Sequence, residues 1–191
     1  MRRVGLFGGT FDPIHIAHLS MAAAAAEQCG LESVLLVPAA NPPHRRQGAR
    51  ASFEDRFRMV EIACEGNPLF LPSPLDAGPG KSYSILMVER FLRENLDADP
   101  YFIIGADAFA DITSWHRWRD LARLVTFAVV GRPGAGYQIP PDTRVHRVDG
   151  VNLPISSSEI RAGLAGAEAA PVDLPPGVLE YVQQKQLYRG T

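Results

Sequence analysis

The chain has 191 residues, of which 46% are hydrophobic and 21% are charged. This composition is typical of a globular domain and excludes a disordered chain. The formal net charge of −2 excludes a global basic field that would hold the protein on nucleic acid or on an anionic membrane. We therefore expect neither partner, and any phosphate ligand must be bound by locally placed donors.

The N-terminal sequence and the cysteines indicate a cytoplasmic protein. The apolar run Val4–Phe7 is interrupted at once by Gly8 and Gly9, so it is too short for the core of a signal peptide. No stretch approaches the roughly 20 apolar residues that span a bilayer. Cys29 and Cys64 lack a CxxC spacing, which favours reduced, packed thiols, with a structural disulfide as the less favoured alternative.

The first half of the chain alternates strand and helix patterns. We expect a strand at Val4–Phe7, a helix from about His18 to Cys29 that ends at Gly30, a strand at Val34–Val37 that ends at Pro38, and a helix from Ser52 to about Glu65. Ser52 can cap this last helix. Its expected buried face carries Phe53, Phe57, Val60 and Ala63. Residues 39–51 are rich in Pro and Arg, which predicts a surface loop.

The second half continues this alternation. The expected elements are a short strand at Leu69–Leu71, a loop at Pro72–Ser82, a helix at Ser84–Glu94, a strand at Tyr101–Ile104, a helical segment at Ala106–Ile112, a corner at Trp115–Trp118, strands at Thr126–Val130 and Arg144–Val148, a helix opening at Ser156–Ser158 and a helix at Gly177–Lys185. Strands that are apolar along their whole length suit a parallel sheet covered on both faces. We predict a single doubly wound, Rossmann-like α/β domain over residues 1–191, with a mostly parallel sheet and a ligand crevice at the carboxyl ends of its strands.

The segment from Gly8 to His18, with the sequence GGTFDPIHIAH, joins the first strand to the first helix. The glycines allow a ligand to approach the backbone, and the helix N-terminus offers free N–H groups to a phosphate. His15 and His18 project from nearly the same face, where both imidazoles can donate to phosphate oxygens. A metal site is the alternative, but no neighbouring Cys or Glu completes a ligand set, so we expect no metal ligands among these side chains.

A second motif, SSSEIR, runs from Ser156 to Arg161. Ser156 or Ser157 can cap the helix that begins here, and its N–H groups can bind an anion. Arg161 lies about one turn into the helix, where its guanidinium can reach a phosphate. Taken alone, this pattern is that of an ordinary capped helix.

The first motif resembles the GGxFDPxHxGH signature of the class I-like nucleotidyltransferase superfamily, with Ala17 where Gly is usual. The second resembles its ISSTxIR motif, with Ser158 in place of Thr. The chain looks most like the bacterial nicotinate-nucleotide adenylyltransferases. This resemblance implies catalytic roles for His15, His18 and Arg161. It implies ATP contacts at Gly8, Gly9, Thr10, Phe11, Gly105, Asp107, Arg132, Ser156, Ser157 and Ser158.

The sequence between the motifs resembles the same family. Residues 41–45 resemble its NPPHK segment, residues 82–84 its SYT segment, and residues 105–118 its GAD…W…W stretch, while residues 132–134 match a late RPG turn. Arg45 stands where Lys is usual, and Ser84 where Thr is usual. The resemblance implies that Trp115 stacks on a pyridine ring, and we expect Trp118 to be core. The implied substrate-binding residues are Asn41, His44, Arg45, Tyr83, Ser84 and Trp115.

The resemblance implies transfer of AMP from ATP to nicotinate mononucleotide, which gives nicotinate adenine dinucleotide and pyrophosphate in NAD biosynthesis. We expect in-line attack by the mononucleotide phosphate without a covalent intermediate, and Mg²⁺ bound to ATP. One alternative is a sister adenylyltransferase that takes nicotinamide mononucleotide or phosphopantetheine. Another is a nucleotide-binding module without catalysis. The expected assembly is a monomer or a small homo-oligomer.

Overall fold

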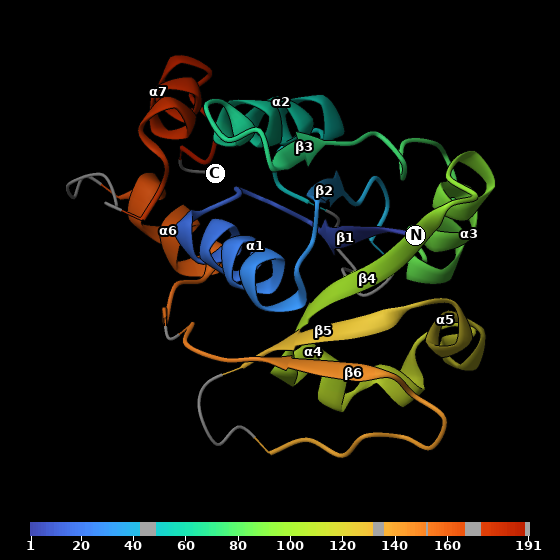
Figure 1. Ribbon diagram of the computed structural model, residues 1–191. Helices are drawn as coiled ribbons and strands as arrows, with labels where there is room; N and C mark the ends of the chain where they lie inside the picture. The colour runs from blue at the N-terminus through green and yellow to red at the C-terminus, as the bar shows by residue number, and fades with distance from the viewer. Residues whose placement is uncertain (43–48, 132–135, 152, 167–172, 190–191) are drawn as a thin grey trace.

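A six-stranded sheet forms the centre of the computed structural model, which describes residues 1–42, 49–131, 136–151, 153–166 and 173–189 (Figure 1). Its order is β3-β2-β1-β4-β5-β6, and all five strand pairs are parallel. The strands are β1 (Arg2–Gly9), β2 (Ser33–Pro38), β3 (Phe70–Pro72), β4 (Ala98–Gly105), β5 (Thr126–Val130) and β6 (Val145–Val148). The predicted doubly wound α/β fold is confirmed, and among the described strands the sheet is wholly parallel.

The direction of winding reverses between β1 and β4. From β1 the chain moves outward through β2 to β3, and it then returns to β4, beside β1, before moving outward through β5 to β6. The two central strands pair with Leu6 opposite Phe102. In open parallel sheets, such a reversal leaves a crevice at the carboxyl ends of the two strands. Here those ends are Gly8 and Gly9 on β1 and Gly105 on β4.

Helices cover both faces of the sheet. Successive strand residues point to opposite faces, so Leu6 packs in one hydrophobic cluster and Phe7 in the other. This arrangement explains why the strands are apolar along their whole length. One face carries α1 (Ile16–Cys29), α2 (Phe53–Cys64), α6 (Ser157–Ala165) and α7 (Pro176–Gln184). The other carries α3 (Ser84–Glu94), α4 (Ala106–Ala110), the 3-10 turn η1 (Ile112–Ser114) and α5 (Trp118–Leu124).

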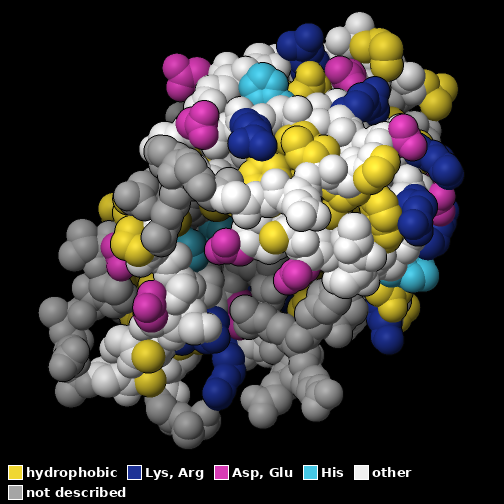
Figure 2. All heavy atoms as spheres, turned by 90° about the horizontal axis from the view of Figure 1, so that it is seen from below, with side chains coloured by type: hydrophobic (Ala, Val, Ile, Leu, Met, Phe, Trp, Pro, Cys, Tyr) yellow, Lys and Arg dark blue, Asp and Glu magenta, His cyan; other side chains and the backbone are white. Residues whose placement is uncertain are grey.

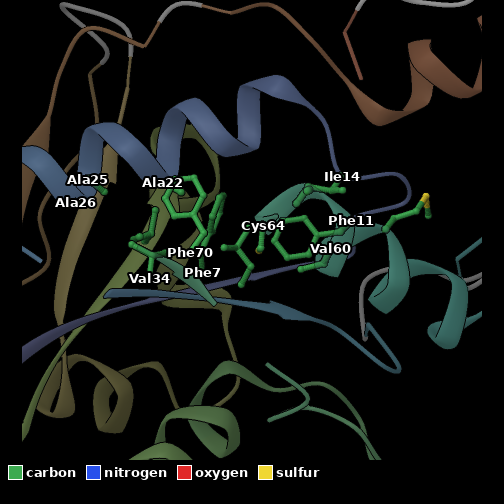
Figure 3. Close-up of a cluster of buried hydrophobic side chains, with 14 of the residues drawn as sticks. Phe7, Phe11, Ile14, Ala22, Ala25, Ala26, Val34, Val60, Cys64 and Phe70 are labelled. Carbon is green, nitrogen blue, oxygen red and sulfur yellow. The ribbon is translucent and has the colours of Figure 1, made fainter. Parts of the chain in front are cut away.

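Helix α1 packs on the sheet through small side chains. Ala22 and Ala25 are fully buried, and Figure 3 shows them on the side of the helix that faces Phe7 and Phe70. The aromatic rings of the sheet fill the space that the alanine side chains leave, which keeps the interface closely packed. Ala22, Ala25 and Ala26 therefore form the sheet-facing side of α1, while Ala23 of the same run is exposed, and this packing fixes the helix that begins at the two histidines.

Three predicted helix ends are confirmed. Gly30 ends α1 in the left-handed conformation, with φ of 62°. The Ser52 side chain accepts a hydrogen bond from the Asp55 N–H at the start of α2. The Ser156 side chain accepts one from the Glu159 N–H at the start of α6.

The predicted buried face of α2 is wrong in part. Val60 and Ala63 are buried, but Phe53 and Phe57 are only half-buried. Arg56, which was not part of the predicted face, is 1% exposed and shares the buried side of the helix with Val60 and Ala63. A guanidinium can be buried there because backbone carbonyl groups accept its hydrogen bonds.

Helix α5 was not predicted, because the two tryptophans suggested only a corner. Trp118 begins this helix, and it is half-buried against the second hydrophobic cluster with the Arg119 guanidinium 4.6 Å from its ring centroid. The prediction that Trp118 is core is therefore correct only in part. Cys29 and Cys64 are both buried free thiols, as predicted. None of the helices in the described ranges is long and apolar enough to cross a bilayer.

Candidate active site

A cavity of about 170 Å³ opens at the carboxyl ends of β1 and β2. Its walls come from the glycine turn after β1, the loop after β2, the start of α3 and the corner before α5. The lining residues are Gly8, Gly9, Thr10, Val37, Ala39, Pro42, Asp76, Ser82, Tyr83, Ser84, Met87, Trp115 and His116. Three predicted ATP contacts and three predicted substrate contacts therefore line one cavity.

The two glycines of the turn have different roles. A Cβ atom at Gly8 would meet only the Met87 side chain, at 3.7 Å, so this position leaves room on the cavity side. A Cβ atom at Gly9 would lie 2.8 Å from the Phe11 ring, which is too close for any real contact. Gly8 thus leaves space for a ligand, and Gly9 leaves space for Phe11.

His15 and His18 form a stacked pair at the start of α1. Their ring centroids are 3.7 Å apart and their planes differ by 26°. The His15 backbone N–H donates to Nδ1 of His18 over 3.2 Å. Because Nδ1 of His18 accepts, the proton of the neutral imidazole lies on Nε2, which is then a donor. The backbone thus selects the tautomer that can donate to a phosphate oxygen.

Phe11 supports this pair from the core. Its ring meets the His18 ring edge-on at 5.0 Å and the Phe7 ring at 5.6 Å, and the side chain is 2% exposed. The resemblance suggested Phe11 as an ATP contact, but Phe11 is not among the residues that line the cavity. The position of its ring indicates that Phe11 fixes the orientation of His18.

Burial keeps both histidines neutral. Desolvation lowers the pKa of His15 from 6.5 to about 4, and the nearby charge of Asp173 opposes this shift. Desolvation also holds the pKa of His18 well below its usual value, with a further contribution from His15. Within the described part of the chain, Nδ1 of His15 is buried without a hydrogen-bond partner. Such an atom is costly to leave unpaired, so the pair is suited to receive a polar ligand.

The second motif lies directly against the first. Nη1 of Arg161 donates to the backbone carbonyl oxygen of Asp12 over 2.7 Å, and Nη2 donates to Oγ of Ser158 over 3.1 Å. The Ser157 hydroxyl donates to the carbonyl oxygen of Pro13 over 3.0 Å. Segments 149 residues apart thus meet beside the turn that leads to His15. The structure therefore places Arg161 against the turn that ends at the His15–His18 pair, and neither histidine is among the residues that line the first cavity.

Asp12, which is fully buried, is the centre of this junction. Its carboxylate accepts hydrogen bonds from the N–H groups of Arg50 and Ala51, at 2.8 and 3.1 Å, and from the Tyr188 hydroxyl at 2.8 Å. It also lies 3.9 Å from Nη1 of Arg161. Sequence reasoning missed both Asp12 and Tyr188, since neither has a local pattern that marks a contact over 176 residues.

A second cavity, of about 410 Å³, lies beside this junction. Its lining residues are Arg50, Ser158, Arg161, Ala162, Ala165, Tyr188 and Arg189. On the face of the molecule in Figure 2, acidic and basic side chains are interspersed. This mixture of charges agrees with the net charge of −2. The cluster of arginines in the second cavity is therefore a local concentration of positive charge.

The predicted substrate side of the first cavity has an aromatic wall. Trp115 packs edge-on against Phe102, with the ring centroids 6.1 Å apart, and Tyr83 lies against His116 at 4.2 Å. Sequence reasoning missed His116 as a lining residue, although it directly follows Trp115. The wall suits a flat heteroaromatic ring.

Asn41 joins two loops at the mouth of this cavity. Its side-chain amide donates to the carbonyl oxygens of Gly78 and Gly80, at 3.0 and 3.1 Å. Its backbone N–H donates to the Ser82 hydroxyl over 2.8 Å, and its carbonyl oxygen accepts from the Ser82 N–H. Asn41 was predicted to bind substrate, and these contacts place its amide group between the loops.

The same loops hold a half-buried carboxylate. Oδ2 of Asp76 accepts a hydrogen bond from the Ala40 N–H over 3.1 Å. Burial raises the pKa of Asp76, and a hydrogen bond from the Ser82 side chain opposes this shift. Asp76 therefore ties the loop after β2 to the loop before α3 inside the cavity wall, a role that the sequence did not indicate.

The remaining predicted site residues lie apart from the cavities or outside the described residues. Gly105 ends β4, and Asp107 is exposed in the first turn of α4, so both lie at the predicted carboxyl edge of the sheet. His44, Arg45 and Arg132 lie outside the described residues. Within the described ranges, no group of three or more His, Cys, Asp or Glu side chains has the arrangement of a metal site.

Comparisons with known proteins agree with this geometry. Residues 6–163 match the family model described as cytidylyltransferase-like. A relative from Solibacter usitatus, named "Probable nicotinate-nucleotide adenylyltransferase", is 48% identical over 97% of this chain and 99% of its own length. A relative of the same name from Listeria monocytogenes is 38% identical over 97% of both chains.

Solved structures give the same fold. The Plasmodium falciparum nicotinic acid mononucleotide adenylyltransferase complexed with NaAD superposes with a TM-score of 0.82 over 98% of both chains, at 19% identity. A structure from Vibrio parahaemolyticus named "Putative Nicotinate-nucleotide Adenylyltransferase" gives a TM-score of 0.73 over 96% of this chain and 99% of its own, at 18% identity.

Proposed function

We infer the function of this protein from the premise that it belongs to the cytidylyltransferase-like family and, within it, to the nicotinate-nucleotide adenylyltransferases. It transfers AMP from ATP to nicotinate mononucleotide, which yields nicotinate adenine dinucleotide and pyrophosphate. One observation in the structure carries this conclusion. The turn after β1 begins at the cavity with the aromatic wall, accepts a hydrogen bond from Arg161 at the Asp12 carbonyl oxygen, and ends at the stacked His15–His18 pair.

The acceptor supplies the nucleophile. A phosphate monoester carries close to two negative charges at neutral pH, so its oxygen attacks without a side-chain base. The oxygen forms a bond to the α-phosphorus of ATP as the bond to the bridging oxygen of the β-phosphate breaks, and that electron pair leaves with pyrophosphate. Positioning and charge stabilisation then account for catalysis.

The histidine pair stabilises the charge on the α-phosphate. Nε2 of His18 is a donor in the tautomer that the His15 backbone N–H selects. Donors that are already oriented stabilise charge in the transition state without the cost of reorganisation. We assign Arg161 to the leaving pyrophosphate, because two of its five donors are used within the protein and the others can face a ligand.

The aromatic wall of the first cavity is assigned to the pyridine ring of the acceptor. Trp115 supplies the flat surface, and Tyr83 and Ser84 at the start of α3 border it. Asp107, at the other side of the crevice, is assigned to the adenosine part of ATP. These assignments predict that Trp115→Ala raises KM for the mononucleotide more than KM for ATP.

We propose that Mg²⁺ enters as part of the substrate Mg·ATP. Mg²⁺ keeps several waters and is commonly held by substrate phosphates with one or two carboxylates. The Asp12 carboxylate is engaged by N–H and O–H donors, so it is not a free ligand. Chelation with EDTA should abolish turnover, and excess Mg²⁺ should restore it.

An acceptor panel tests the activity. Purified protein is incubated with Mg·ATP and, separately, with nicotinate mononucleotide, nicotinamide mononucleotide or phosphopantetheine, while pyrophosphate is measured. We expect the highest kcat/KM with nicotinate mononucleotide. Faster turnover of either other acceptor would assign the protein to a sister activity, and ATP binding with no pyrophosphate release would make it a binding module.

The free, buried thiols of Cys29 and Cys64 suit a reducing compartment, so we place the reaction in the cytoplasm. The proposed partners are the small-molecule substrates alone, with the protein as a monomer or a small homo-oligomer.

A further inference from the structure

We propose that Arg50 and Arg189 act with Arg161 as a three-arginine site for the β- and γ-phosphates of ATP and for the pyrophosphate product. The three side chains line the second cavity, of about 410 Å³. The inference rests on the proposed function and extends it to two residues that neither motif contains.

The cavity is built from three distant parts of the chain. Arg50 comes from the segment before α2, Arg161 from α6, and Arg189 from the segment after α7. Hydroxyl groups of Ser158 and Tyr188 complete the polar lining. None of the described lining residues is acidic, so the cavity has the donor set of an anion site.

The three arginines have N–H donors that are not used in contacts within the described part of the protein. In the described part of the chain, the side chains of Arg50 and Arg189 make no hydrogen bond or ion pair. Arg161 uses one donor on the Asp12 carbonyl oxygen and one on the Ser158 hydroxyl. A guanidinium has five N–H donors in a fork that matches phosphate oxygens. The cavity therefore offers unpaired donors from three side chains.

Asp12 holds these segments together. Its carboxylate accepts from the Arg50 backbone N–H at 2.8 Å and from the Tyr188 hydroxyl at 2.8 Å, and Tyr188 directly precedes Arg189. The Asp12 backbone carbonyl oxygen accepts from Arg161. Asp12 thus anchors the chain at Arg50 and beside Arg189, and both of these exposed side chains line the cavity.

The balance of charge favours a polyanion. Three guanidinium groups face the cavity, while Asp12 brings one carboxylate that is fully buried and turned to other donors. A ligand with several negative charges and phosphate oxygens compensates this excess. The cavity adjoins residues 12 and 13, which lead to His15. If His15 and His18 bind the α-phosphate, the next two phosphates extend toward the arginines.

The test uses inorganic pyrophosphate and the full chain. Calorimetric Kd values for pyrophosphate are measured for the wild type, Arg50→Gln, Arg189→Gln and the double variant, together with KM for ATP and for the mononucleotide. We expect each single change to weaken pyrophosphate binding about 10-fold and to raise KM for ATP. KM for nicotinate mononucleotide should stay within about twofold.

Arg123→Gln is the matched control, since Arg123 lies on α5, its side chain is 74% exposed, and it forms an ion pair with Asp120 at 3.5 Å. It should bind pyrophosphate as the wild type does. Arg189→Lys should recover part of the lost affinity, which separates charge from a change in folding.

Two results would overturn the inference. One is a wild-type protein that transfers AMP but does not bind pyrophosphate. The other is a pair of variants, Arg50→Gln and Arg189→Gln, that bind pyrophosphate within twofold of Arg123→Gln. Failure of the proposed function looks different, because it gives no pyrophosphate from ATP with any acceptor.

Discussion

The two histidines of the first motif show how burial and backbone contacts prepare side chains for phosphate chemistry. They lie against each other with their centroids 3.7 Å apart, and desolvation lowers the pKa of both. Two imidazolium ions so close together would repel each other. As neutral rings they can stack, and each keeps one N–H for a ligand.

We predict that His18→Ala lowers kcat by about 100-fold or more, since removal of one oriented donor to transition-state charge has an effect of this order. Steady-state assays with saturating Mg·ATP and nicotinate mononucleotide measure it. The thermal midpoint of the variant serves as the control for folding. A variant with kcat within a few-fold of the wild type would remove His18 from the mechanism.

The lowered pKa of His15 predicts how stability depends on pH. The unfolded chain protonates this residue near pH 6.5, and the folded protein only near pH 4. Between these values the unfolded state binds more protons, so the contribution is fully present above pH 6.5 and is lost as the pH falls toward 4. The loss for this residue is about 3 kcal/mol at most. His18 acts in the same direction.

Urea unfolding at pH 7.5 and pH 5 measures this loss, and His15→Asn isolates it. Other groups also titrate in this range, but they are shared by both proteins. The free energy of unfolding should therefore fall less in His15→Asn than in the wild type between the two pH values. Equal losses would show that His15 does not carry the pH dependence.

At the scale of elements, α2 joins the loops that form the first cavity. Arg56 is 1% exposed, and its guanidinium donates to the carbonyl oxygens of Thr10 and Ala39 at 2.7 and 2.8 Å. Nε donates to the carbonyl oxygen of Ala51 at 3.3 Å. Thr10 and Ala39 line the first cavity, so one side chain of α2 fixes the ends of both β1 and β2 there.

We predict that Arg56→Met lowers the free energy of unfolding by about 3 kcal/mol or more, because it leaves buried carbonyl groups without their charged donor. It should also raise KM for the mononucleotide, since the cavity loses its fixed walls. Arg58→Met is the matched control on the same helix, with an exposed ion pair to Glu61. Chemical denaturation should show a change of less than about 1 kcal/mol for the control. Similar losses for both variants would contradict this role of Arg56.

Most elements could be predicted because their signals are local. Ser52, Gly30 and Ser156 mark helix ends through contacts within a few residues of themselves. The buried face of α2 could not be predicted at Arg56, because its burial depends on carbonyl groups from three other segments. Helix α5 has only seven residues, and its periodicity is too short to detect.

At the scale of the whole molecule, the fold and the contact between the two motifs could be predicted from the sequence. The contact between the C-terminal segment and the first motif could not. Alternating apolar strands and helices indicate a parallel sheet, and such sheets place their ligands at one edge. Nothing near Tyr188 in the sequence indicates a contact with Asp12, 176 residues away. Only the folded chain shows that α7 and the residues after it return to the start of α1.

The contact between Tyr188 and Asp12 predicts a linked effect on stability and on ATP binding. Burial, reinforced by Asp12, raises the pKa of Tyr188, so its hydroxyl stays protonated and donates to that carboxylate. Tyr188→Phe removes a hydrogen bond to a buried charged group, which should lower the free energy of unfolding by about 1–3 kcal/mol. It should also raise KM for ATP several-fold, since Tyr188 anchors the segment that carries Arg189.

Tyr181→Phe separates the two effects. Tyr181 lies on α7, a few residues before Tyr188, and its hydroxyl donates to Asp55 on α2 over 2.9 Å. Tyr181 lines neither cavity. This variant should lose stability and keep its KM for ATP. Denaturation and steady-state kinetics on the two variants decide the matter, because equal KM values for ATP in both would mean that the end of the chain stabilises the fold without shaping the site.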